Sequence, residues 1–100
     1  MEKLLEGIGP DASTVVNEQG GRQSKLVAEF DILPWKGILQ VALIMTEASK
    51  KYGKDNWRKI ARVDHLNHAL AHLCAYCMGD NQDDHLGHAA TRILFALETV

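Results

Sequence analysis

The residues with the clearest capacity for chemistry are histidines and carboxylates in the later part of the chain. All five histidines lie between positions 65 and 88, and four aspartates lie within that stretch or directly before it. These aspartates are Asp64, Asp80, Asp83 and Asp84. Imidazoles mixed with carboxylates suit a divalent transition metal, whereas carboxylates with water suit magnesium or manganese. The pattern therefore predicts a metal centre or a site for acid–base chemistry.

The spacing of these residues predicts which of them meet. His65, His68 and His72 are separated by three and four positions, so one helix would present them as a stripe. Asp84 and His88 are four positions apart and would share one side of the next helix. Antiparallel packing of the two helices would bring together the residues nearest the turn. These are His72, Asp80, Asp83, Asp84 and His88.

Each of these residues also has an ordinary structural interpretation. A histidine on a helix face can be an amphipathic edge residue, and carboxylates around a turn are often helix caps. We favour the functional interpretation for the cluster as a whole, because imidazoles and carboxylates are interleaved on two neighbouring helices. Glu47 lies earlier, among mostly apolar residues, and faces either solvent or a polar centre of the fold.

A basic and aromatic segment precedes the histidine-rich region. Its cations are Lys50, Lys51, Lys54, Arg58 and Lys59. With Tyr52 and Trp57 interleaved, such cations could hold a phosphate tail while an aromatic ring stacks on a base. The alternative is a solvated loop whose Trp57 fills the core, which we prefer for Trp57 taken alone. Arg22 and Lys25, near two glycines, could add contacts to an anion.

The two cysteines, Cys74 and Cys77, form a C-x-x-C pair without a second pair to complete a zinc site. Cys77 falls on the apolar stripe of its helix, so we interpret both as thiols buried in the core.

Three helices are predicted to position these residues. Apolar residues at spacings of three and four predict helices over residues 35–52, 64–78 and 83–97, the later two capped near Asp64 and Asp83. The inward faces are predicted to be Leu66, Ala69, Leu70, Leu73 and Cys77 on the second helix, and Leu86, Ala90, Ile93, Leu94 and Leu97 on the third. Short connections between the helices favour a small helical bundle, an all-α fold.

The chain divides in composition near residue 21. Residues 1–21 contain four glycines among scattered polar residues, which predicts a flexible arm with little regular structure. Residues 22–100 are predicted to form a single helical domain, because 100 residues leave room for one core. Residues 22–33 are expected to be irregular, although part of them could form a short strand.

Length and charge exclude several classes of protein. A net charge of −2 argues against a general binder of nucleic acid or anionic membranes. The longest apolar run, residues 38–45, is far shorter than the roughly 20 residues that span a bilayer. We expect a cytoplasmic protein with no membrane partner. So small a helical core favours assembly into a homo-oligomer.

A series of short motifs follows an order known from one protein family. In chain order they are Gly21-Arg22, Lys51-Tyr52-Gly53, Asn56-Trp57-Arg58, Ala69 with His72, Gly79-Asp80, Asp83-Asp84 and His85-Leu86-Gly87-His88. Residues 21–98, which contain them, resemble the N-terminal domain family of phage dATP/dGTP diphosphohydrolases, often described as MazG-like. If the chain is encoded by a phage, its location would be the cytoplasm of the host.

The resemblance implies an all-α nucleotide pyrophosphohydrolase. Such an enzyme binds Mg²⁺ or Mn²⁺ and cleaves a deoxynucleoside triphosphate, such as dATP or dGTP, to the monophosphate and pyrophosphate. Together with the residue chemistry, it suggests Asp84, His72 and His88 as catalytic groups. The expected metal ligands are Glu47, Asp80, Asp83, Asp84 and His88. The expected nucleotide contacts are Arg22, Lys25, Lys51, Asn56, Trp57 and Arg58.

Two other functions remain open. MazG-type enzymes usually carry E-x-x-E on one helix and E-x-x-D on the next, whereas here Lys50 follows Glu47 and the second motif reads Asp80-x-x-Asp83. A non-catalytic protein that sequesters a nucleotide or cyclic nucleotide is therefore the alternative. The third possibility is a helical bundle that mediates interactions and has no small-molecule site.

Overall fold

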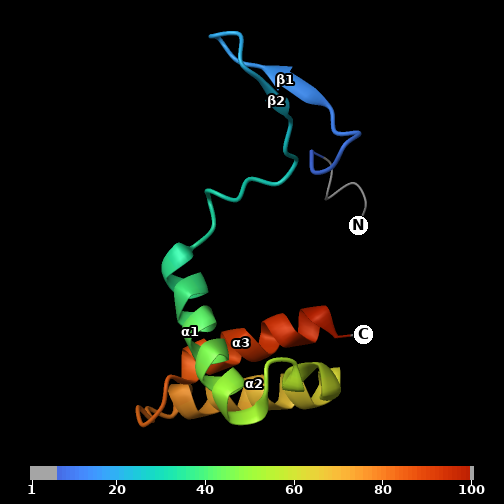
Figure 1. Ribbon diagram of the computed structural model, residues 1–100. Coiled ribbons are helices and arrows are strands. Elements are labelled where there is room, and N and C mark those ends of the chain that lie inside the picture. Colours follow the sequence, from blue (N-terminus) through green and yellow to red (C-terminus); the bar gives the residue numbers. More distant parts are fainter. Residues whose placement is uncertain (1–6, 100) are drawn as a thin grey trace. The chain divides into compact units, whose positions relative to one another are not determined.

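The computed structural model describes residues 7–99, which divide between Leu33 and Pro34 into two compact units. The first unit contains a two-stranded sheet, and the second contains three α-helices (Figure 1). Among residues 7–99, no helix has both the length and the apolar character needed to cross a membrane.

The first unit is built on a β-hairpin. Strands β1 (Thr14–Val16) and β2 (Arg22–Ser24) pair antiparallel, with Val15 opposite Gln23. Asn17 closes the turn, because its side-chain oxygen accepts hydrogen bonds from two backbone N–H groups of the loop, over 3.0 and 2.8 Å.

This hairpin corrects the predictions of an all-α fold and of little regular structure in residues 1–21. The fold is largely helical but includes a small sheet, and β1 lies inside the segment expected to lack regular structure. The composition of residues 1–21 did not reveal the Asn17 turn, which depends on hydrogen bonds between specific neighbours.

The second unit confirms the three predicted helices. They are α1 (Trp35–Tyr52), α2 (Arg62–Cys77) and α3 (His85–Glu98), with a short 3₁₀ helix, η2 (Asn56–Lys59), before α2. The predicted caps were misplaced. Ala61 is the cap of α2, and Asp64 lies in its first turn, where a carboxylate complements the helix dipole. The cap of α3 is Asp84 rather than Asp83.

The core of this unit lies mainly between α2 and α3, which run side by side (Figure 1). Its buried apolar side chains, among the described residues, are Ala69, Ala89, Phe95 and Ala96. Gly87 lets α1 approach α3 closely, since a Cβ there would lie 2.7 Å from Cδ1 of Ile44. Small residues at these crossings bring the helices near enough for polar side chains to meet across them.

The predicted inward faces of α2 and α3 are mostly wrong. Ala69 is buried and Leu73 is half-buried, as expected, but the other predicted core positions are exposed. These are Leu66, Leu70, Cys77, Leu86, Ala90, Ile93, Leu94 and Leu97. The interior face of α2 instead runs through His65, Ala69 and His72. A histidine stripe has the same helical period as a leucine stripe, so periodicity did not distinguish them.

The cysteines give a second correction. Cys74 and Cys77 are both free thiols and both are exposed, rather than buried in the core. They lie outside the interior face of α2, which runs through His65, Ala69 and His72.

Candidate functional site

A buried histidine organises the site. His65 of α2 is completely buried, and its Nδ1 lies 3.1 Å from Nη1 of Arg92 on α3. A guanidinium can only donate, so Nδ1 accepts this bond, and Nε2 donates to the carbonyl of Trp57 over 2.9 Å. His65 is thus a hydrogen-bonded core residue that holds η2 against α2 and orients Arg92.

A cavity opens beside this core, with a volume of about 410 Å³. Its walls come from α1, η2, α3 and the segments next to η2. The apolar part of the lining includes Ile44, Met45, Ala48, Ile60 and Phe95, and the polar part includes Asn56, His88 and Arg92. This volume and a mostly apolar wall with a few polar groups are typical of small-molecule sites.

Trp57 has less freedom to bind a ligand than the sequence suggested. Its ring stacks on Phe95 with 4.5 Å between centroids and an angle of 7° between the planes. The guanidinium of Arg58 lies over the ring as well, 4.2 Å from its centroid, and also pairs with Asp55 over 3.3 Å. Trp57 therefore borders the cavity mainly as part of its wall, which agrees with the core-filling alternative.

A more open groove adjoins the cavity and contains several of the predicted site residues. It is lined by Gln40, Glu47, Lys50, Lys51, Asp84 and His88, among others. Ile44, Ala48, Tyr52 and His88 line both the groove and the cavity. The imidazole of His88 consequently lies where an apolar cavity meets a charged groove.

Asp84 is tied to two helices by its carboxylate. Oδ1 accepts a hydrogen bond from the backbone N–H of Gly87 over 3.0 Å, and Oδ2 accepts one from Nε2 of Gln40 over 2.5 Å. The Gln40 bond first, and the Gly87 bond second, lower the pKa of Asp84. Its charge therefore caps α3 and fastens α3 to α1.

The other charged residues of the groove are at the surface. Glu47 and Lys50 form an exposed ion pair of 3.2 Å, one helical turn apart on α1. The ammonium of Lys51 lies 5.1 Å from the centre of the Tyr52 ring. Such exposed contacts are weak, so these side chains can exchange them for contacts to a ligand.

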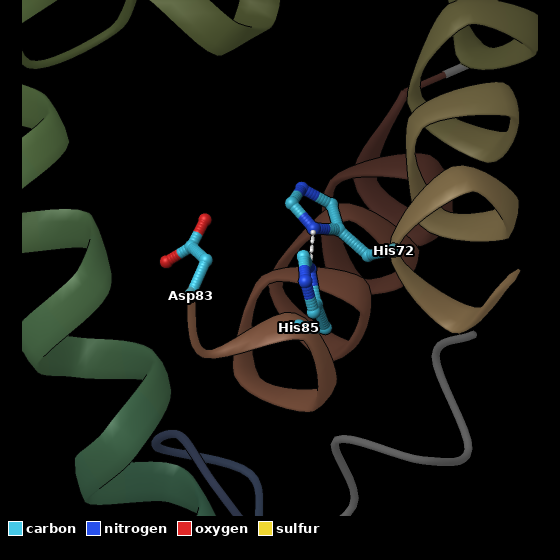
Figure 2. A group of neighbouring side chains, drawn as sticks. All are labelled: His72, Asp83 and His85. Carbon is cyan, nitrogen blue, oxygen red and sulfur yellow. Dashed lines mark hydrogen bonds between the residues drawn. The ribbon is translucent and has the colours of Figure 1, made fainter. Parts of the chain in front are cut away.

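A second group of polar residues surrounds the turn between α2 and α3. Nδ1 of His72 lies 3.0 Å from Nδ1 of His85, with the carboxylate of Asp83 nearby (Figure 2). The other ring nitrogen of His85 lies 2.5 Å from Oδ2 of Asp80. His88 connects this group to the groove, because its Nε2 is 3.4 Å from Oδ1 of Asp83 and its ring stacks on His72 with 5.0 Å between centroids.

The charges of this group follow from its surroundings. Burial, followed by the nearby His88 and His85, lowers the pKa of His72, so its neutral form is favoured. The hydrogen bond from His85 lowers the pKa of Asp80 and keeps that carboxylate ionised. The turn therefore offers neutral imidazole nitrogen and carboxylate oxygen side by side.

The predicted site residues thus fall into several places. Glu47, Lys51, Asp84 and His88 share the groove, while His72, Asp80 and Asp83 belong to the cluster at the turn. Asn56 and Trp57 line the cavity, and Arg58 lines a separate hollow together with Lys59 and Arg62. Arg22 and Lys25 belong to the first unit, at and next to β2.

The sequence analysis missed two residues of the site, Gln40 and Arg92, and it counted His85 among the clustered histidines without giving it a role in the site. The signal that could have found Arg92 is its position four residues after His88, which is itself four after Asp84. This spacing places Asp84, His88 and Arg92 on one side of α3. Gln40 offered no comparable signal, because its partner Asp84 is 44 positions away.

The comparisons with known proteins agree with the motif order. A family model described as dATP/dGTP diphosphohydrolase, N-terminal, matches residues 17–100. No curated protein and no solved structure matches the chain. The matched range includes all three α-helices, the cavity, the groove and the cluster at the turn.

Proposed function

The chain belongs to the dATP/dGTP diphosphohydrolase N-terminal family, and from that premise we propose that it hydrolyses a deoxynucleoside triphosphate such as dATP or dGTP to the monophosphate and pyrophosphate. The observation that carries the proposal is the meeting of the apolar cavity with the charged groove at His88. A nucleotide has the same two parts, an apolar base and an anionic tail.

In this proposal the base and sugar occupy the cavity. Apolar side chains such as Ile44 and Met45 would cover the base, and Asn56 would supply hydrogen bonds to its edge. The triphosphate would leave the cavity past His88 and enter the groove, where Lys50 and Lys51 neutralise it. Arg92, fixed by its bond to His65, adds a cation on the cavity side.

The oxygen donors of the groove fit the divalent ion that the family resemblance implies. Glu47 and Asp84 present carboxylates to the groove, and carboxylate oxygen is the donor that Mg²⁺ and Mn²⁺ prefer. When bound, such an ion would supply charge neutralisation of the phosphate oxygens and polarise a water molecule.

His88 would take the proton of the attacking water. Its Nε2 lies 3.4 Å from Asp83, and a carboxylate next to an imidazole orients the ring. The water oxygen would bond to the α-phosphorus, and the bond to the bridging oxygen would break, so that pyrophosphate leaves. His88 touches the reacting atoms in this scheme, whereas Asp83 positions it.

One observation favours the alternative of nucleotide binding without hydrolysis. Both oxygens of Asp84 already accept hydrogen bonds from protein groups, and Glu47 pairs with Lys50. Protein donors therefore satisfy carboxylates that a catalytic metal would need. In this second function, the same cavity and groove would sequester a nucleotide.

The test is an assay of the purified protein with the four deoxynucleoside triphosphates, in Mg²⁺ or Mn²⁺, that measures pyrophosphate and monophosphate. Hydrolysis predicts equal amounts of both products and a loss of at least 100-fold in His88→Gln. His68→Gln is the matched control, because His68 is an exposed histidine of α2 outside the cavity and the groove. A rise in melting temperature with nucleotide, without any pyrophosphate, would support the binding function instead.

A further inference from the structure

The cluster at the α2–α3 turn differs in chemistry from the carboxylates of the groove. One nitrogen each of His72 and His85 and one oxygen of Asp83 all lie within 4.8 Å of one another. The two imidazoles are half-buried, whereas Asp83 is exposed. Figure 2 shows the two rings joined at their Nδ1 atoms, with the Asp83 carboxylate across from them.

The distance between the two Nδ1 atoms suits a shared ion. They are 3.0 Å apart. Two nitrogens that each lie about 2.1 Å from one metal ion are separated by about 3.0 Å at the roughly 90° angle of octahedral coordination, and by about 3.4 Å at the tetrahedral angle that Zn²⁺ prefers. Asp83 can rotate toward the same point, because its side chain is exposed.

Asp80 adds an independent observation. Its carboxylate lies 2.5 Å from Nε2 of His85, so Nε2 donates this hydrogen bond and the lone pair of the neutral ring is on Nδ1. In the metal-free chain Nδ1 of His72 donates a proton to that lone pair, and a bound ion would take the place of this proton. Histidines that bind metal usually donate their other N–H to a carboxylate in this manner, which sets the tautomer and the ring orientation. A histidine that only capped a helix would not need this arrangement.

We propose that His72, His85 and Asp83 bind one divalent transition-metal ion through two imidazole nitrogens and one carboxylate oxygen. Imidazole favours ions such as Zn²⁺, Co²⁺, Ni²⁺ and Fe²⁺ over Mg²⁺, which prefers oxygen. Asp80 supports His85 from outside the metal's coordination shell, and water completes the coordination. This site is separate from the ion of the proposed hydrolysis, and it does not depend on that function.

The site would also join α2 to α3. His72 lies in the last part of α2, and His85 is the first residue of α3. An ion held by both helices binds the folded chain and not the unfolded one, so it raises the stability of the folded state. Two of its ligands also contact His88, which lines the groove: Asp83 lies 3.4 Å from Nε2 of His88, and the ring of His72 stacks on that of His88.

The experiment uses the full chain after removal of metal with a chelator. Co²⁺ is titrated while the visible absorption is recorded, and Zn²⁺ is titrated by calorimetry. The buffer contains millimolar Mg²⁺ to occupy the carboxylates of the groove, and we expect one equivalent of Co²⁺ or Zn²⁺ to bind without being displaced by Mg²⁺. Competition by Mg²⁺ on equal terms, or no saturable binding at all, would overturn the proposal.

Matched variants identify the ligands. His85→Gln and Asp83→Asn should abolish saturable binding, and Asp80→Asn should weaken it by about 10- to 100-fold. His68→Gln should bind as the wild type does, because His68 lies outside the cluster. Circular dichroism of each variant checks folding, and Asp83→Asn is the safest variant because its side chain is exposed. If Asp83→Asn and a folded His85→Gln both bind the ion as tightly as the wild type does, the ion binds at another place and the proposal is wrong.

The titration is independent of the hydrolysis assay. It contains no nucleotide, so an inactive protein that binds Co²⁺ at His72 and His85 would refute the proposed function and support this site. A protein that releases pyrophosphate in Mg²⁺ and does not bind Co²⁺ would support the proposed function and refute this site.

Discussion

Arg92 donates a hydrogen bond from Nη1 to Nδ1 of the buried His65, over 3.1 Å, and so connects α3 to the interior of α2. The bond leaves Nε2 of His65 to donate to the carbonyl of Trp57. His65 thereby holds η2 against α2 and orients Arg92, whose guanidinium borders the cavity. His65 is consequently a core residue that also positions a residue of the candidate site, Arg92.

Replacement of this histidine should be costly. His65→Ala should lower the free energy of unfolding by about 3 kcal/mol, because it leaves a cavity and removes the partners of Arg92 and the Trp57 carbonyl. Urea denaturation followed by circular dichroism measures the change. His68→Ala, at an exposed position of the same helix, should change the free energy by less than about 0.5 kcal/mol. Equal losses in the two variants would contradict the structural role of His65.

Removal of a groove cation should weaken nucleotide binding. Lys51→Ala should raise the dissociation constant of a deoxynucleoside triphosphate by about 10-fold, since a charge-assisted hydrogen bond contributes roughly 1.5–3 kcal/mol. Calorimetric titration measures this constant, and Co²⁺ binding should be unchanged. Lys59→Ala is the control, because Lys59 lines a different hollow. A similar loss of affinity in both variants would indicate only a general effect of charge.

The cap of α3 can be tested by two substitutions at one position. Asp84→Ala should reduce the stability by about 1 kcal/mol or more, because it removes the acceptor for Gly87 and the bond to Gln40. Asp84→Asn should reduce the stability much less, since asparagine is also a good N-cap residue. Thermal unfolding of metal-free protein compares them. Equal melting temperatures for the alanine and asparagine variants would be inconsistent with a capping role.

Low pH should remove the extra stability that Asp84, compared with asparagine, gives to the folded state at the N-cap of α3. Its hydrogen bonds lower the pKa of Asp84 in the folded state below the ordinary value of 3.8. The resulting stability is present above pH 3.8 and is lost as the pH falls through the lower, folded-state pKa. The difference in stability between wild type and Asp84→Asn should therefore shrink as the pH falls below 3.8, in chelator-treated protein. A difference that is constant from pH 6 to pH 2 would contradict this account.

The exposed leucines predict self-association. Leu70 on α2 and Leu94 and Leu97 on α3 are 63%, 46% and 75% exposed, while the buried apolar core of the helical unit consists largely of alanines. A second copy of the chain would cover such apolar surface, as in many symmetric dimers. Sedimentation equilibrium should give a mass above 11.1 kDa, and Leu70→Lys together with Leu94→Lys should shift it toward the monomer. A monomeric wild type at high micromolar concentration would exclude this assembly.

The sequence by itself determined the helices and the neighbourhood of the polar residues. Apolar periodicity located α1 at its observed bounds and the other two helices to within two residues. Helical spacing also predicted that His72, Asp83 and their neighbours gather at the α2–α3 turn. These features depend on contacts within one helix or across one short turn, which the order of residues specifies directly.

Only the tertiary structure decided which stripe of α2 faces inward. Leu66 and Leu70 lie outside, while His65 lies inside, because Arg92 and the Trp57 carbonyl satisfy both of its ring nitrogens. The same packing divided the predicted carboxylates between a groove and a cluster. The hydrogen bonds responsible join residues that are far apart in the sequence: Arg92 and His65 are 27 positions apart, and Gln40 and Asp84 are 44 positions apart. No local sequence pattern encodes such distant partners.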